Sequence, residues 1–334
     1  MMFLFRLLAP ALALPTMAAS AASGTCAANA PRLVIAAAGS LTSSFAPVQK
    51  LFTERSGVCV ELRSGGSVKL ARDLRLPEGR EVDIFASADV EVNERMLKSA
   101  GLAQHAIRFA EGAMVLAYTT ASPQAGSIAV DGKVAADWTT QLQKPGVRIG
   151  GSHPFLDPGG YRADMVFQLA QLSSGRTGLY NALLDHSVVT RPGEKLGVAF
   201  DYQFTYEHSA RAALAADQSG AYRYASLPEV IGMGVAPRGV LAAAGVTMPG
   251  VDGPSAPAVR IPASRVTWGL SILDQAPHAA LAAQFLQLFF SAEGVALRAA
   301  GPSPINPPLG MAGDIAGLPA SLRPLVQPLP ESAP

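Results

Sequence analysis

Residues 33–41 read Leu-Val-Ile-Ala-Ala-Ala-Gly-Ser-Leu, a short apolar run that ends at a glycine and a serine before a helical pattern begins. The same arrangement returns at Val58–Leu62, which leads into Ser-Gly-Gly-Ser, and at Val82–Ala86, which leads into Ser-Ala-Asp. Three successive strand–turn–helix units predict a parallel sheet, so the chain is assigned to the α/β class. All three turns follow the carboxyl ends of strands, where open α/β sheets bind their ligands.

A second α/β unit, with a similar alternation of strands and helices, follows the first. Strands are expected at 113–118, 146–150 and 198–206, and helices at 161–172 and 178–185. A strand over 265–272 then returns to the first unit, where a helix over 277–299 packs and the proline-rich tail after Gly301 forms a surface strap. The pattern predicts two lobes joined by two crossings, with residues 27–112 and 272–334 in the first lobe and 113–271 in the second.

The charge balance excludes some partners. The 334 residues contain 26 Lys and Arg against 25 Asp and Glu, and charged residues make up 15% of the chain. Such a chain has no basic field for a nucleic-acid backbone, so no nucleic-acid partner is expected. Residues 1–21 combine an early cation, a short apolar run and a small-x-small end at Ala19–Ala21, which is typical of a signal peptide and predicts a periplasmic protein.

Cys26 and Cys59 are the only cysteines. In an exported chain an even pair tends to close, so we predict a Cys26–Cys59 disulfide, with two reduced thiols as the alternative.

Motifs for catalysis are missing. The sequence has no phosphate loop, no G-x-S-x-G and no H-E-x-x-H, and its five histidines are scattered without metal-ligand spacing. Glycine and hydroxyl residues instead stand at predicted helix starts, at Gly39-Ser40, at Gly65–Ser67 and at Asp157–Gly160. A helix start offers unpaired N–H groups and partial positive charge, so several of them in one cleft would hold a small dianion without Lys or Arg.

Each of these turns also has a purely structural explanation. Ser40 and Ser67 are good N-cap residues, and Asp157 before Pro158 is a natural N-cap with proline in the first helical position. Only their combination favours ligand binding.

Six short motifs, in order, resemble those of periplasmic molybdate/tungstate-binding proteins of ABC uptake systems, and the tungstate-binding branch most. They begin at Leu33, Gly66, Val82, Asp157, Arg191 and Asp201, and a likeness around Arg265–Leu270 and Phe285–Gly301 follows. The resemblance implies a two-lobed, type II periplasmic-binding-protein fold. Each lobe would be a mixed, mostly parallel sheet flanked by helices, with the ligand cleft between the lobes.

The resemblance also implies the residues of the site. It places oxyanion contacts at Gly39, Ser40 and Ser67 and along the backbone of Phe155, Leu156 and Asp157, and it implies that Asp157, Glu194 and Tyr206 reach the ligand. In this branch an Asp and a Glu donate oxygens to the metal atom, here Asp157 and Glu194, widening its coordination to six. A carboxylate facing a dianion is repulsive unless it binds that electron-poor centre or is protonated, so sulfate would be disfavoured.

The sequence departs from the family at two places. The segment from Glu194 to Tyr206 is short, so a solvated Glu194 after the 191–193 turn is an equal alternative, and Gly159 replaces a frequent cysteine. Glu207 is a fallback carboxylate, on the strand face opposite the aromatic residues. Tyr206 could instead be a core residue with its hydroxyl bonded to backbone.

Basic residues near the turns offer a different anion clamp, made of Arg63, Lys69 and Arg72. At helical spacing, however, Lys69 and Arg72 are expected to point to solvent. Arg162 is expected to brace the cleft without touching the ligand.

These observations predict a non-enzymatic, extracytoplasmic solute-binding protein that closes on molybdate or tungstate by hinge motion. Its expected partner is an ABC permease with a separate ATPase subunit; no cofactor is expected, and a monomer is the default. One alternative is the same fold with another small anion, such as sulfate, phosphate or a small carboxylate. Another is an enzyme or sensor with Ser40 or Ser67 as nucleophile, although no motif places a histidine beside either serine.

Overall fold

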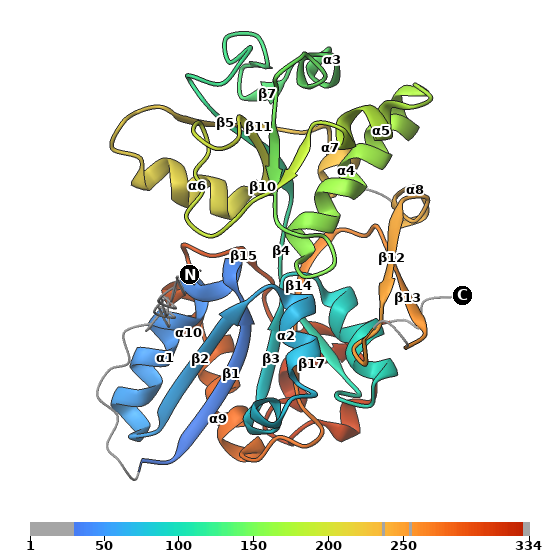
Figure 1. Cartoon of the computed structure of the whole chain (residues 1–334). Coiled ribbons are helices and arrows are strands. Elements are labelled where there is room, and N and C mark those ends of the chain that lie inside the picture. Colours follow the sequence, from blue (N-terminus) through green and yellow to red (C-terminus); the bar gives the residue numbers. More distant parts are fainter. Residues whose placement is uncertain (1–29, 236–237, 254–255, 330–334) are drawn as a thin grey trace, which may run out of the picture.

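The computed structural model describes residues 30–235, 238–253 and 256–329. It contains two mixed sheets in two lobes, which meet where β4 and β14 run between them (Figure 1). The predicted signal peptide and Cys26 lie outside the described residues. Cys59, in the first lobe, is disulfide-bonded, and its pairing with Cys26 stays a prediction.

The first lobe holds the predicted parallel units. The order of its main strands is β17-β16-β4-β14-β3-β1-β2, with β15 paired to β4. The bounds are β1 Arg32–Ala38, β2 Cys59–Gly65, β3 Ile84–Ser87, β4 Ala106–Gly112, β14 Val266–Ile272, β15 Ser303–Pro304, β16 Leu309–Ala312 and β17 Val326–Pro328. Strand β1 pairs in parallel with both β2 and β3, as the repeated pattern predicts. The carboxyl ends of these three strands therefore face the second lobe together.

Helices cover the first sheet. They are η1 Gly39–Leu41, α1 Thr42–Ser56, α2 Ser67–Asp73, η2 Pro77–Glu81, the π-helix η3 Val92–Leu97, α9 Ala279–Phe290, α10 Ala292–Leu297, η4 Ile315–Gly317 and η5 Arg323–Leu325. Phe45 of α1 stacks on Phe289 of α9 with ring centroids 4.6 Å apart, so the carboxyl-terminal helix closes the core that the amino-terminal units begin. Helix α1 ends at Gly57, whose φ of +70° lets the chain leave the helix in a left-handed turn.

The second lobe is built around β5 and β10. Its strand order is β6-β7-β11-β5-β10-β8-β9. The strands are β5 Met114–Thr119, β6 Ala129–Val130, β7 Lys133–Val134, β8 Ile149–Gly151, β9 Ser187–Val189, β10 Tyr202–Tyr206 and β11 Tyr222–Ser226. The helices are α3 Trp138–Leu142, α4 Pro158–Ser174, α5 Leu179–Leu184, α6 Glu207–Ala216, α7 Glu229–Gly232 and α8 Arg238–Leu241.

Two crossings join the lobes. Strand β4 continues into β5 with Ala113 between them, and the chain returns at β14. Because β14 pairs with β3 and β4, the return precedes Val266, whereas the boundary expected from the sequence is at residue 272. A separate hairpin of β12 (Gly245–Pro249) and β13 (Ala258–Pro262) flanks both lobes on one side (Figure 1).

Three expectations about local structure are wrong. The strand predicted over 198–206 is regular only from Tyr202, because a turn through Gly197, with φ +80°, leaves Val198 76% exposed. The helix predicted over 277–299 breaks at Ser291, whose hydroxyl caps α10 by accepting from the N–H of Gly294 at 3.1 Å. The tail after Gly301 is not a surface strap, since it supplies sheet strands whose Leu309 and Met311 are fully buried.

Candidate functional site

A polar pocket lies between the two lobes at the carboxyl ends of β1 and β3. It encloses about 340 Å³, within the usual size of small-molecule sites. The first lobe contributes Gly39, Ser40 and Ala88. The second lobe contributes Ser152, Asp157, Gly159, Gln203, Phe204, Thr205, Tyr206 and Ser209.

Three helices begin at this pocket. Gly39 and Ser40 open η1, which runs directly into α1 and has no side-chain cap. Asp157 and Gly159 stand at the start of α4, and Ser209 lies in the first turn of α6. The described residues that line the pocket include no Lys or Arg. The positive charge at the pocket wall therefore comes from helix N-termini, which favour an anion.

Ser40 is placed to donate a hydrogen bond into the pocket. Its Oγ accepts from the indole N–H of Trp268 at 3.4 Å, and its carbonyl oxygen accepts from Nε2 of His208 at 3.0 Å. A carbonyl can only accept, so Nε2 of His208 carries the proton. With its oxygen engaged by Trp268, the Ser40 hydroxyl keeps its own proton for a ligand.

Asp157 is both an N-cap and a pocket residue. Its Oδ1 accepts from the Ser152 hydroxyl at 3.0 Å and from the N–H of Gly159 at 2.7 Å, which caps α4. Burial raises the pKa of this carboxyl, and the two hydrogen bonds oppose the rise. The N-cap explanation for Asp157 is therefore correct, and it does not exclude ligand contact.

Phe155 and Leu156 do not line the pocket. The N–H groups of residues 155–157 bond back to His153, through its Nδ1 at 3.1 Å and its carbonyl oxygen at 2.9 and 3.0 Å. Their amides are thus already paired, and the carbonyls of Phe155 and Leu156 face α2 of the other lobe.

Ser67 supports the pocket through a hydrogen bond to one of its lining residues. It is fully buried, and its Oγ accepts from the N–H of Ala88 at 3.0 Å. Ser67 therefore positions the pocket residue Ala88 and does not itself line the cavity.

Tyr206 has features of both roles considered for it, a pocket residue and a core residue whose hydroxyl bonds to backbone. Tyr206 lines the pocket, and its hydroxyl, 3.4 Å from the carbonyl oxygen of Ala88, donates to that backbone group. Burial holds the pKa of this phenol well above its usual value, so the hydroxyl stays protonated.

The structure does not bring Glu194 to the pocket. Glu194 is exposed, and its Oε2 accepts from the N–H of Arg191 at 2.9 Å within its own turn. The fallback carboxylate, Glu207, is the first residue of α6 and does not line the cavity either. Asp157 is thus the one carboxyl among the described lining residues.

Four lining residues with polar side chains are not among those expected from the sequence: Ser152, Gln203, Thr205 and Ser209. Strand alternation places Gln203 and Thr205 on the face opposite the aromatic residues, a signal that could have marked them as polar contacts. Ser209 carries the same signal as Ser40, a hydroxyl in the first turn of a helix that follows a strand.

A buried ion pair joins the lobes behind the pocket. Nη2 of Arg162 lies 2.9 Å from Oδ2 of Asp89, with both side chains at most 1% exposed. The Tyr161 hydroxyl donates to the same Oδ2 at 2.8 Å, and Nη1 of Arg162 donates to the carbonyl of Ser264 at 3.0 Å. Arg162 therefore braces the cleft at its return crossing.

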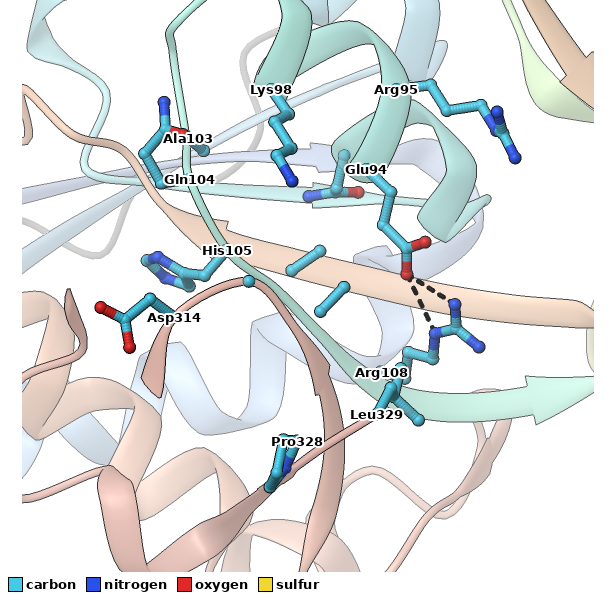
Figure 2. Close-up of a pocket in the computed structure, with 14 residues that line it drawn as sticks. Glu94, Arg95, Lys98, Ala103, Gln104, His105, Arg108, Asp314, Pro328 and Leu329 are labelled. Carbon is cyan, nitrogen blue, oxygen red and sulfur yellow. Dashed lines mark hydrogen bonds and ion pairs between the residues drawn. The ribbon is translucent and has the colours of Figure 1, made fainter. Parts of the chain in front are cut away.

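A second cavity, of about 730 Å³, lies within the first lobe. Figure 2 shows the Glu94–Arg108 ion pair on one of its walls and Asp314 on the opposite side. All of its lining residues come from one lobe, so lobe closure would not enclose a solute there. Nowhere in the described ranges do three or more His, Cys, Asp or Glu side chains gather so that they could hold a metal ion.

Residues 33–300 match the family described as bacterial extracellular solute-binding protein, and the chain belongs to that family. It is an extracytoplasmic solute-binding protein of an ABC-type transporter and not an enzyme, and a permease is its implied partner. In the described parts of the chain, no helix is long and apolar enough to cross a membrane.

Similar proteins support this class. An uncharacterized solute-binding protein of Petrotoga mobilis is 30% identical over 84% of this chain and 85% of its own length. The molybdate/tungstate-binding protein WtpA of Pyrococcus abyssi is 27% identical over 79% of this chain and 81% of its own. The chain spans under half the length of several other uncharacterized solute-binding proteins that it matches.

The fold is confirmed by solved structures. The sulfate-binding protein SubI of Mycobacterium tuberculosis H37Rv superposes with a TM-score of 0.56 over 83% of this chain and 88% of its own, at 16% identity. The two mixed α/β sheets therefore form the predicted type II periplasmic-binding-protein fold.

His208 predicts a pH dependence of stability. Burial lowers its pKa from 6.5 to about 4, a shift that the bond to Ser40 opposes and nearby Arg211 assists. Between those pH values His208 binds a proton in the unfolded chain but not in the folded chain. The contribution of His208 to the free energy of unfolding is therefore fully present above pH 6.5 and is lost on acidification towards pH 4. The shift corresponds to about 3 kcal/mol of unfolding free energy.

Urea unfolding of the wild type and of His208→Gln at several pH values measures this loss. We expect the wild type to lose about 3 kcal/mol more than the variant on acidification from about pH 7 to about pH 4. Equal losses of unfolding free energy in the two proteins would show that His208 is hydrated and does not cause the acid destabilisation.

Proposed function

We propose that the protein captures a tetrahedral oxyanion, molybdate or tungstate, between its lobes and delivers it to the permease. The observation that carries this proposal is the inter-lobe pocket, in which three helix starts meet several hydroxyl groups and no Lys or Arg lines the described wall. Such a wall stabilises an anion through N–H and O–H donors. The name of the Pyrococcus abyssi relative supports molybdate and tungstate as the anions.

In this proposal Ser40 and the backbone at Gly39 donate to the oxyanion, and Asp157 faces its metal atom. Ser67 and Tyr206 hold Ala88 and the pocket wall in place. Glu194 would not contribute an oxygen from its exposed turn, so the six-coordinate arrangement through Asp157 and Glu194 lacks one of its two carboxylates.

A second candidate is another small anion. The pocket volume of about 340 Å³ exceeds what one tetrahedral ion fills, so it also accommodates an anion with a small organic group. Thermal unfolding with a panel of anions separates the two: stabilisation by molybdate and tungstate alone supports the proposal, and stabilisation by sulfate, phosphate or a small carboxylate supports the alternative.

A further inference from the structure

Helix α2 of the first lobe contacts the second lobe through an arginine. Nη1 of Arg72 donates to the carbonyl oxygen of Phe155 at 2.9 Å, and its Nη2 donates to the carbonyl oxygen of Pro249 at 3.0 Å. Helical spacing predicts that Arg72 points to solvent, and that expectation is wrong. Its partners lie in the loop before α4 and at the end of β12, far from Arg72 in the sequence.

The backbone of the same helix is also held against that loop. The N–H of Lys69 donates to the carbonyl oxygen of Leu156 at 3.0 Å. A Cβ added at Gly66 would lie 2.4 Å from this Leu156 oxygen, although the backbone of Gly66, with φ −69° and ψ 134°, suits any residue. Gly66 is therefore required for the close approach of the two lobes and not for its own conformation.

We propose that Gly66 and Arg72 form a latch that assembles when the lobes close and sets how slowly the solute leaves. Both are positioning residues, since neither lines the pocket. Opening the cleft separates α2 from the 153–157 loop, because the two lie on different lobes. The latch thus belongs to the closed form alone, and it acts on whichever anion the pocket takes.

Stopped-flow release of molybdate tests the latch. Arg72→Ala is expected to release molybdate about tenfold or more faster, because two charge-assisted hydrogen bonds of the closed form are lost. Gly66→Ala is expected to act in the same direction by blocking the approach, but its added Cβ would also lie 3.0 Å from Oδ2 of Asp157, so Arg72→Ala is the decisive variant. Lys69→Ala is the matched control, because it removes a cation from the same helix. The Lys69 side chain pairs with Asp73 of its own helix at 2.6 Å, so the release rate should change less than about twofold.

A ligand-free experiment keeps the latch separate from the proposed function. In anion-free protein carrying Lys69→Cys and Leu156→Cys, the rate of disulfide formation reports how often the lobes close. Adding Arg72→Ala should slow this cross-linking severalfold while the melting temperature stays the same. Unchanged cross-linking, or release rates equal to the wild type, would overturn the latch; failure of molybdate to bind the wild type would overturn only the proposed function.

Discussion

Replacing Asp157 with alanine is expected to weaken the binding of molybdate and tungstate by about a hundredfold or more. The variant removes the one carboxyl among the described lining residues and the cap of α4, whose N-terminus faces the anion. Loss of an N-cap costs about 1 kcal/mol of stability, so the folded protein should survive. Titration calorimetry with each anion measures the effect.

Asp157→Asn is the matched control, since asparagine also caps helices and can accept from Gly159 and Ser152. If the carboxylate itself contacts the metal atom, the asparagine variant loses molybdate as the alanine variant does and gains no sulfate binding. Unchanged molybdate affinity in Asp157→Ala would contradict a role for this carboxyl in binding.

The second large effect concerns the buried ion pair between Asp89 and Arg162. Arg162→Met leaves the carboxylate of Asp89 buried with only Tyr161 and the N–H of Glu91 as donors. Removing one partner of a buried pair costs about 3–5 kcal/mol. Arg162 also donates to the carbonyl of Ser264 just before the return crossing, so the variant loses that contact as well.

Urea unfolding of the ligand-free protein measures this cost. The double variant Asp89→Asn/Arg162→Met removes both charges and should recover most of the stability. Burial already raises the pKa of Asp89 while Arg162 opposes the rise, so without Arg162 the deficit should shrink as the pH falls and Asp89 takes a proton. A loss below about 1 kcal/mol in Arg162→Met would show that the pair is hydrated.

The fold was predictable because its signals are local. The apolar runs at β1, β2 and β3 each end at a turn and a helix, and their parallel pairing follows from that alternation. The carboxyl-terminal tail was not predictable in the same way. Its prolines indicated a loop, whereas burial of Leu309 and Met311 depends on pairing β16 with the distant β4.

The site was predictable only in part. Gly39, Ser40, Asp157 and Tyr206 line the pocket. The first three were predictable from the helix starts in the sequence, whereas Tyr206 was expected only from the family resemblance. The position of Glu194 depends on how the 191–201 segment folds back, which motif order does not determine. The contacts of Arg72 depend on the approach of two lobes, and helical spacing contains no information about it.

Thermal unfolding of the mature protein with tungstate, molybdate, sulfate, phosphate or no anion tests the central claim most directly. An anion at about 1,000 times its dissociation constant stabilises the folded state by about 4 kcal/mol, which corresponds to a rise of roughly 5–10 °C in melting temperature. We predict that rise with tungstate and molybdate and none with sulfate or phosphate. A rise with sulfate or phosphate, or no rise with any of the four, would contradict the proposed function.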